Sequence, residues 1–258
     1  AEAAAKPAAR TIAVDLVFAR FDDRDPAWRD ELWAAVDEQA LDDGLRRRLA
    51  ANGLRAGIVA GDLPPHLAER PRSTSSSSPA EATEPDPPLT HRSLRLLPGR
   101  RGEVVAAAGL DELVLLEDCD GRVRGGTFHD ATGLFELKVR PAADGRVRID
   151  VTPEIRHGPL ERSWVGEDGM FRMEAGQRRH RRDDLAVGIE VREGAVLVVA
   201  GAGDEGATLG DALLRDHRGD RSTMRLLLIR PAGRTVDPMF ADPAAGEDAG
   251  AEDVLPVR

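Results

Sequence analysis

The sequence has no tyrosine, and aromatic residues make up only 3% of its 258 residues. Its hydrophobic core must therefore consist mainly of Leu, Val, Ile and Ala, and an aromatic platform that stacks sugars or bases is not expected. The single cysteine, Cys119, excludes an intramolecular disulfide and a cysteine-rich zinc site. No apolar run approaches the roughly 18 residues that a membrane helix needs, so no transmembrane helix is predicted.

The charge balance narrows the range of partners. The formal net charge is −10, which disfavours binding to nucleic acid or to anionic lipid. Hydrophobic residues make up 41% and charged residues 32%, as in a soluble protein with a charge-rich surface. Small residues open the sequence without a methionine, which is typical of a chain whose signal peptide has been removed and equally of a flexible leader.

Residues 11–70 predict a small β-α-α-β module. A strand with alternating apolar residues is followed by two amphipathic helices and a second short strand. An aspartate precedes each helix as a favoured N-cap, and Asn-Gly ends the second helix. The residues behind this prediction are Ile12, Val14, Leu16 and Phe18, then Asp25, Pro26, Trp28, Leu32 and Val36, then Asp42 and Asn52-Gly53, and finally 54–60.

The composition changes abruptly over residues 71–90, which are rich in Ser and Pro and predict a linker. Residues 1–10 are expected to be a disordered lead, and residues 237–258 an acidic disordered tail. A β-rich domain is predicted between the linker and the tail, over residues 91–236. The fold class is therefore α+β, with the small module followed by a β-rich sandwich or partial barrel.

The clearest element of the β-rich domain is a β-hairpin in residues 134–156. Apolar and charged residues alternate on both sides of Asp144-Gly145, where glycine accepts a positive φ and favours a turn. One face of this hairpin is therefore predicted to be buried. The apolar positions are Phe135, Leu137, Val139, Val147, Ile149 and Val151.

Strand patterns recur at short spacing through the rest of this domain. The polar residues 157–183 are expected to form a long excursion between strands. The expected strands are 94–97, 103–107, 113–117, 122–128, 134–140, 146–152, 185–191, 196–200 and 224–230.

The segment 201–206, Gly-Ala-Gly-Asp-Glu-Gly, follows an apolar run and has the form of a dinucleotide-binding fingerprint. However, Asp204 and Glu205 would place negative charge beside the phosphates, and too little chain follows for a full doubly wound sheet. We therefore interpret the segment as a glycine-rich strand exit, and we predict no cofactor.

Two neighbouring segments are candidates for contact with a protein partner or with another copy of the chain. A basic run ends at Arg182 and is followed directly by Asp183 and Asp184, which favours a solvated loop over a phosphate site. The apolar cluster before it would bind a partner if exposed, whereas a hairpin tip folded onto the sheet would bury it. The residues predicted for partner contact are Trp164, Met170, Phe171, Arg178, Arg179, Arg181 and Arg182.

Catalytic and metal motifs are missing. There is no HExxH and no GxSxG, and the carboxylates that flank Cys119 disfavour a reactive thiolate. The alternative hypothesis is a hydrolase of polysaccharide or peptide, with its carboxylates on the 154–168 loop beside His157 and Trp164. Its candidate acids are Glu154, Glu161, Glu167 and Asp168, and the convergence of two of them in a pocket would support it.

Four segments within residues 134–231 together resemble the secretin domain of type II and type III secretion channels. They are Leu137–Pro141 with Asp144-Gly145 and Val147–Glu154, then Glu193–Gly201, Thr208–Asp211 and Leu226–Pro231. The gate segment and the membrane-lip helix of that family have no counterpart in this sequence. The resemblance therefore implies a soluble relative or partner of these channels rather than a pore.

The whole chain also resembles a group of exported bacterial proteins without an assigned activity. Together these resemblances imply a non-enzymatic exported, periplasmic or envelope protein. Its β-domain would serve in assembly or partner contact.

Overall fold

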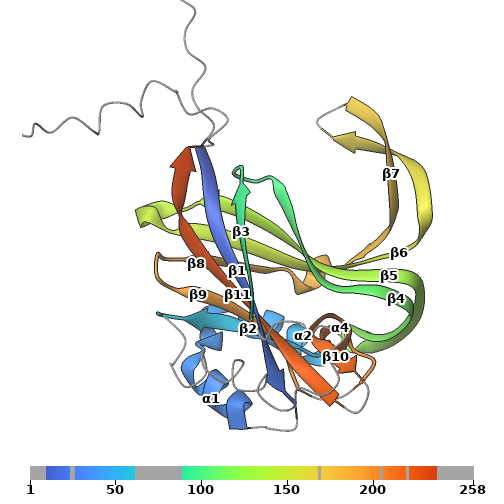
Figure 1. Ribbon diagram of the computed structural model, residues 1–258, viewed down its shortest axis with the longest axis horizontal. Helices are drawn as coiled ribbons and strands as arrows, with labels where there is room; N and C mark the ends of the chain where they lie inside the picture. Colours follow the sequence, from blue (N-terminus) through green and yellow to red (C-terminus); the bar gives the residue numbers. More distant parts are fainter. Residues whose placement is uncertain are drawn as a thin grey trace, which may run out of the picture.

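The computed structural model describes residues 10–23, 27–61, 89–167, 170–203, 206–218 and 221–236. These residues form a β-rich fold with two antiparallel sheets and few helices (Figure 1). The first sheet has the order β2-β9-β11-β1-β3, and β10 also pairs with β11. Its strands are β1 (Arg10–Asp22), β2 (Leu54–Val59), β3 (Leu89–Leu96), β9 (Val196–Gly201), β10 (Arg215–Arg218) and β11 (Arg221–Val236).

The second sheet contains the longest strands and has the order β4-β5-β6-β7. A fifth strand, β8, pairs with the beginning of β6, while β7 pairs with its later part. β7 and β8 therefore follow one another along the same side of β6. These strands are β4 (Arg101–Cys119), β5 (Arg122–Pro141), β6 (Val147–Glu167), β7 (Met170–Arg181) and β8 (Val187–Val191).

The helices are short, and the cap predicted for the second of them is present. The cap predicted for the first, Asp25 with Pro26, lies outside the described residues. The Asp42 side chain accepts a hydrogen bond from Leu45 N and begins α2, which ends before Asn52. Trp28 and Leu32 of α1 are buried, as their spacing predicted. The helices are α1 (Ala27–Ala35), α2 (Asp43–Ala51) and α4 (Leu209–Leu214), with single turns η1 (Glu38–Ala40), η3 (Ala143–Gly145) and η4 (Asp183–Leu185).

The predicted β-α-α-β order is present in β1, α1, α2 and β2, but these elements do not form a sheet of their own. β1 lies between β11 and β3, and β2 pairs with β9. Buried residues of both sheets also belong to one hydrophobic cluster. The division into two domains stays a prediction, because residues 62–88, which include most of the expected linker, lie outside the described residues. The expected lead and tail also lie outside them, except for Arg10 in β1.

The hairpin predicted from alternation is formed by β5 and β6, with η3 as its turn. All six predicted apolar positions are at most 4% exposed, so the buried face is confirmed. The turn has positive φ at Asp144 and Gly145. On the other face, however, Glu136, Thr152 and Glu154 are also buried, which alternation alone did not indicate.

The strands of the second sheet are longer than predicted. The expected pair 103–107 and 113–117 is one strand, β4, and the pair 122–128 and 134–140 is one strand, β5. Residues 157–183 were predicted as a long excursion between strands, but most of them are strand residues themselves, because β6 and β7 pair with each other from Glu154 and Arg181 to Glu167 and Met170. Polar residues on both faces removed the two-residue apolar pattern by which a strand is recognised in sequence.

Candidate functional site

The strands of the second sheet bend where the pairing between β5 and β6 ends. Beyond this bend the β4–β5 hairpin and the β6–β7 hairpin continue separately. Positive φ occurs at Gly109 in β4, Asp130 in β5 and Gly158 in β6. The Gln177 side chain bridges the bend, because its Nε2 donates to the carbonyl oxygens of Asp130 and Gly158, each at 2.9 Å. We call residues 110–130 the folded-back hairpin and residues 159–178 the β6–β7 arm.

The β6–β7 arm contains the predicted apolar contact residues Trp164, Met170 and Phe171. In its register Trp164 is opposite Met173, and Phe171 is opposite Gly166. Opposed residues and residues two apart share one face of an antiparallel hairpin, so these four positions lie on one face. Figure 1 shows the arm reaching away from the rest of the sheet. The side chains of 162–174 lie outside the described residues, so their part in a contact stays a prediction.

The basic run 178–182 is divided by the alternation of β7. Arg178 binds Glu161 across the arm, with 2.9 Å between Nη2 and Oε1. Arg181, on the other face, binds the buried Glu136 at 3.0 Å. Residues 178–181 of the run are therefore strand rather than the solvated loop that their composition suggested.

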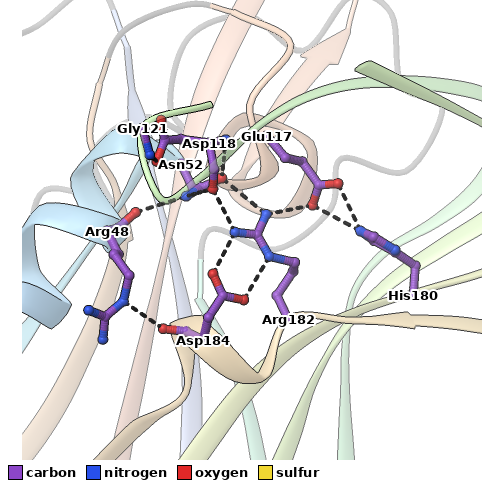
Figure 2. A network of polar contacts seen from close by, with 8 residues as sticks. All are labelled: Arg48, Asn52, Glu117, Asp118, Gly121, His180, Arg182 and Asp184. Carbon is purple, nitrogen blue, oxygen red and sulfur yellow. Dashed lines mark hydrogen bonds and ion pairs between the residues drawn. The ribbon is translucent and has the colours of Figure 1, made fainter. Parts of the chain in front are cut away.

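Arg182, directly after β7, turns into the interior, where its side chain is only 6% exposed. Figure 2 shows its guanidinium between Glu117, Asn52, Asp118 and Asp184. Nη1 donates to Glu117 Oε1 at 2.8 Å and to Asn52 Oδ1 at 3.2 Å. Nη2 donates to the Asp118 carbonyl and to Asp184, and Nε donates to the other oxygen of Asp184. All five guanidinium N–H groups are therefore used inside the chain, and Arg182 belongs to the interior rather than to a contact surface.

The charged groups around Arg182 favour one another's ionised form. Burial acts to raise the pKa of Glu117, but hydrogen bonds from His180 and Arg182 outweigh it and lower this pKa below its ordinary value. The hydrogen bonds with Arg182 likewise lower the pKa of Asp184, and Asp184 in turn raises the pKa of Arg182. His180 completes the group, with Nε2 2.8 Å from Glu117 Oε2. We call Asn52, Glu117, His180, Arg182 and Asp184 the clasp.

Asn52, which is fully buried, joins α2 to the folded-back hairpin (Figure 2). Its Oδ1 accepts from Asp118 N at 3.0 Å, and its Nδ2 donates to the Asp118 carbonyl at 3.1 Å. This side-chain amide therefore bonds to β4 in the way that a neighbouring strand would. Two further groups bond to the same edge of β4, namely Ala207 O at Leu116 N and the Arg225 guanidinium at Ala106 O. The outer edge of β4 is thus closed at several points along its length.

The edge of β7 differs from that of β4. In the described part of the chain, the backbone of β7 hydrogen-bonds only to β6. Arg178 and Arg179 are exposed there, and Arg181 is about one third exposed. The second sheet therefore has one closed edge and one open edge with a basic character.

A second feature, which the sequence did not predict, lies on the polar face of the β5–β6 hairpin, which we call the central hairpin. Glu154 is fully buried, and both of its oxygens accept from Arg101 Nη2 at 2.9 Å. Glu136 is 2% exposed and binds Arg101, Lys138 and Arg181. These contacts explain why carboxylates occur at buried positions, since buried charge must be paired.

The polar face continues into a groove of about 390 Å³ beside the N-terminus of α2. We call it the polar groove, and its lining includes Leu45, Lys138, Arg140, Arg148, Asp150 and Gly188. Arg140 is directly opposite Arg148 in the hairpin register. The sequence contained the signal for this face, because charged residues alternate regularly with the buried apolar ones, but charge alternation alone does not reveal a groove.

The carboxylates of the hydrolase hypothesis are not brought together where the structure describes them. Glu154 is enclosed by Arg101 and Arg156, whereas Glu161 lies beyond the bend and binds Arg178. The side chain of Glu167 and the whole of Asp168 lie outside the described residues. His157 contacts the Phe128 ring, and burial, together with the positive charges of His180 and Arg178, lowers its pKa.

The glycine-rich segment 201–206 begins where β9 ends at Gly201. The buried Arg215 side chain donates to Gly203 O at 3.0 Å and also binds Asp23 and Asp211. The helix that follows, α4, has only six residues, and Asp204 and Glu205 lie outside the described residues. A dinucleotide site receives no support from this arrangement.

The described residues contain neither a metal-binding cluster nor a helix that could span a membrane. No group of three or more His, Cys, Asp or Glu side chains there could hold a metal ion. No described helix is both long and apolar enough to cross a bilayer.

Comparisons with known proteins do not assign the chain to a family. No family model matches the chain, and no curated protein matches it. Among solved structures, it is similar to GspD, a type II secretin from enteropathogenic Escherichia coli, at 11% identity and a TM-score of 0.23. That comparison covers 96% of this chain and 80% of the secretin chain.

Proposed function

We propose that this chain is a non-enzymatic envelope or exported protein whose second sheet is extended at β7 by a strand of a protein partner. One observation carries the proposal: no described residue pairs with the outer edge of β7, while the opposite edge, β4, is closed by Asn52, Ala207 and Arg225. An open edge presents N–H and C=O groups that an extended partner segment can pair with. The envelope location rests on the sequence resemblance of residues 134–231 to secretin domains.

β7 is a better candidate than β2 or β3, the two outermost strands of the first sheet. β2 is met by Asp37, whose backbone exchanges two hydrogen bonds with Ile58 at 2.8 and 3.0 Å. β3 also has no strand at its outer edge among the described residues, but it has eight residues against twelve in β7. β7 also lies partly on the β6–β7 arm, where a partner can approach without displacing another element (Figure 1).

The charge of β7 indicates the chemistry of the partner. Arg179 and Arg181 lie on one face of the strand, and Arg178 and His180 lie on the other. An added strand with acidic side chains would meet opposite charge on both faces, and each such cross-strand pair contributes about 0.2–1 kcal/mol. A second copy that presented its own β7 would bring arginine against arginine. The partner segment is therefore acidic and extended.

Peptide binding followed by amide NMR tests the proposal. A short peptide of alternating valine and glutamate should shift and protect the β7 amides, and a peptide of alternating valine and lysine should not. The Arg179→Glu variant should lose this binding, while Arg124→Glu, an exposed site on the folded-back hairpin, should keep it. Equal binding of both peptides, no binding of either, or a dimer that already occupies β7 would overturn the proposal.

A further inference from the structure

We infer that the polar groove binds a doubly charged oxyanion of the phosphate class, through Arg140 and Arg148. The inference does not depend on the proposed partner at β7. Arg140 and Arg148 are directly opposed across the hairpin. This arrangement costs stability, because like charges in that position repel. Positions at which a sequence breaks such a rule are where a functional site is expected.

One carboxylate serves both arginines. Arg148 Nε lies 3.0 Å from Asp150 Oδ1, and Arg140 Nη1 lies 3.3 Å from Asp150 Oδ2. Neither arginine has another ion pair among the described residues. Their remaining guanidinium N–H groups can therefore bind a ligand while the contacts to Asp150 stay in place.

The other charged groups of the groove leave it with a positive balance. Glu136 already binds Arg101, Lys138 and Arg181, and the Asp42 side chain is engaged as the N-cap of α2. The four cations of the lining outnumber its three carboxylates by one, although the whole chain has a net charge of −10. The cations are Lys138, Arg140, Arg148 and Arg181, and the carboxylates are Asp42, Glu136 and Asp150.

Gly188 of β8 has no side chain, and this leaves the space that the Arg148 guanidinium occupies. A Cβ atom at this position would be 2.5 Å from Arg148 Nη2 and 2.7 Å from Asp150 Oδ1. Any side chain here would therefore push the ion pair into the groove. The missing side chain and the opposed arginines are independent observations, and both favour an open, arginine-lined site.

The geometry of the donors selects the class of ligand. A guanidinium group binds phosphate through two parallel N–H groups, and two such groups match the charge of a dianion better than that of a single carboxylate. The ligand is therefore inorganic phosphate or the phosphoryl group of a small phosphate monoester. These two sources share their chemistry, and titration with each of them distinguishes one from the other.

The experiment is a titration of the full chain with inorganic phosphate and with glycerol phosphate, followed through the Nε–Hε NMR signals of arginine and by calorimetry. Acetate and chloride at equal ionic strength are the controls. We expect saturable shifts of the Arg140 and Arg148 signals with at least one phosphate compound. Binding of glycerol phosphate should weaken as the pH falls through about 6, where a phosphate monoester takes up its second proton.

Variants separate the groove from general attraction to positive charge. Arg140→Ala and Arg148→Ala should each weaken binding by about tenfold or more, since each removes charge-assisted hydrogen bonds. Gly188→Ala should also weaken it, because its methyl group displaces Arg148. Arg92→Ala, exposed on β3 in the other sheet, should bind as the unchanged chain does. The inference is overturned if phosphate binds no better than acetate, or if Arg140→Ala and Arg148→Ala leave its affinity unchanged.

Discussion

The folded-back hairpin and the β6–β7 arm leave the same sheet at the same bend, yet only one of them is held against the body (Figure 1). The folded-back hairpin returns to α2, where Asn52 bonds to its backbone and Arg182 binds Glu117. It also buries Leu115 and Phe128. In the described part of the arm, the side-chain contacts to other elements are those of Gln177 at its base.

This difference indicates that contacts with the rest of the fold, rather than the strands themselves, determine whether a long hairpin is fixed and whether its edge is closed. We call such contacts anchors. The clasp residues come from α2, from β4 and from the junction between β7 and β8, which are far apart in the sequence. The clasp closes the β4 edge of the folded-back hairpin, whereas it does not contact the outer edge of β7 in the arm. Substitutions that remove an anchor should therefore make the two hairpins more alike.

Arg182→Ala should have the largest effect. It removes the buried cation that binds Glu117 and one of the two donors to the Asn52 amide oxygen, and the loss of one partner from a buried ion pair costs about 3–5 kcal/mol. Denaturant unfolding should report a loss of this size. Hydrogen exchange should show that the amides of the folded-back hairpin lose more protection than those of the arm. Equal protection changes in both hairpins would contradict the role given to the clasp.

Ile149→Ala should destabilise the base from which both hairpins arise. Ile149 is fully buried, and truncation of a core aliphatic side chain costs about 2–5 kcal/mol. Arg148→Ala is the matched control, because this neighbour points to the polar face and is 45% exposed, so the change should stay within about 0.5 kcal/mol. Equal losses in denaturant melts of the two variants would mean that the two faces are not distinguished as described.

The same contrast explains what could be predicted from the sequence. The apolar face of the central hairpin, the N-cap at Asp42 and the helix end at Asn52 follow from local patterns, and all are confirmed. For the arm, the sequence suggested only a hairpin tip around the apolar cluster, and the full length of its strands was not predicted because its residues lack an apolar alternation. The clasp could not be predicted either, because Asn52 and Arg182 are 130 residues apart, and no local pattern relates a helix end to a basic run.

Asn52→Ala should have a smaller effect than the loss of Arg182. The substitution removes the two hydrogen bonds with which the side chain closes β4, and unsatisfied buried polar groups cost about 1–3 kcal/mol. Amide exchange at Asp118 should accelerate more than exchange along β7, because only the edge of β4 is opened. Unchanged exchange at Asp118 would show that the other contacts close this edge without Asn52.

Acid should weaken the clasp in a defined direction. The pKa values of Glu117 and Asp184 are lowered in the folded chain. The ionised groups therefore stabilise the fold fully at a pH above their pKa values in the unfolded chain. This stabilisation is lost as the pH falls through their lower pKa values in the folded chain. Unfolding free energies should therefore decrease below about pH 4, where model carboxylates begin to take up protons. Glu117→Gln should flatten this pH dependence, and Glu112→Gln, exposed on the same strand, should not.

Arg178→Ala should have the smallest effect, although Arg178 belongs to the same basic run as Arg182. Its ion pair with Glu161 joins side chains that are 65% and 45% exposed, and such surface pairs contribute at most about 1 kcal/mol. The pair also lies on the arm, where no clasp depends on it. Unfolding experiments should therefore find a change within about 0.5 kcal/mol, and salt should reduce it further because exposed charges are screened. A loss close to that of Arg182→Ala would mean that the arm is anchored as firmly as the folded-back hairpin, and the contrast between the two would fail.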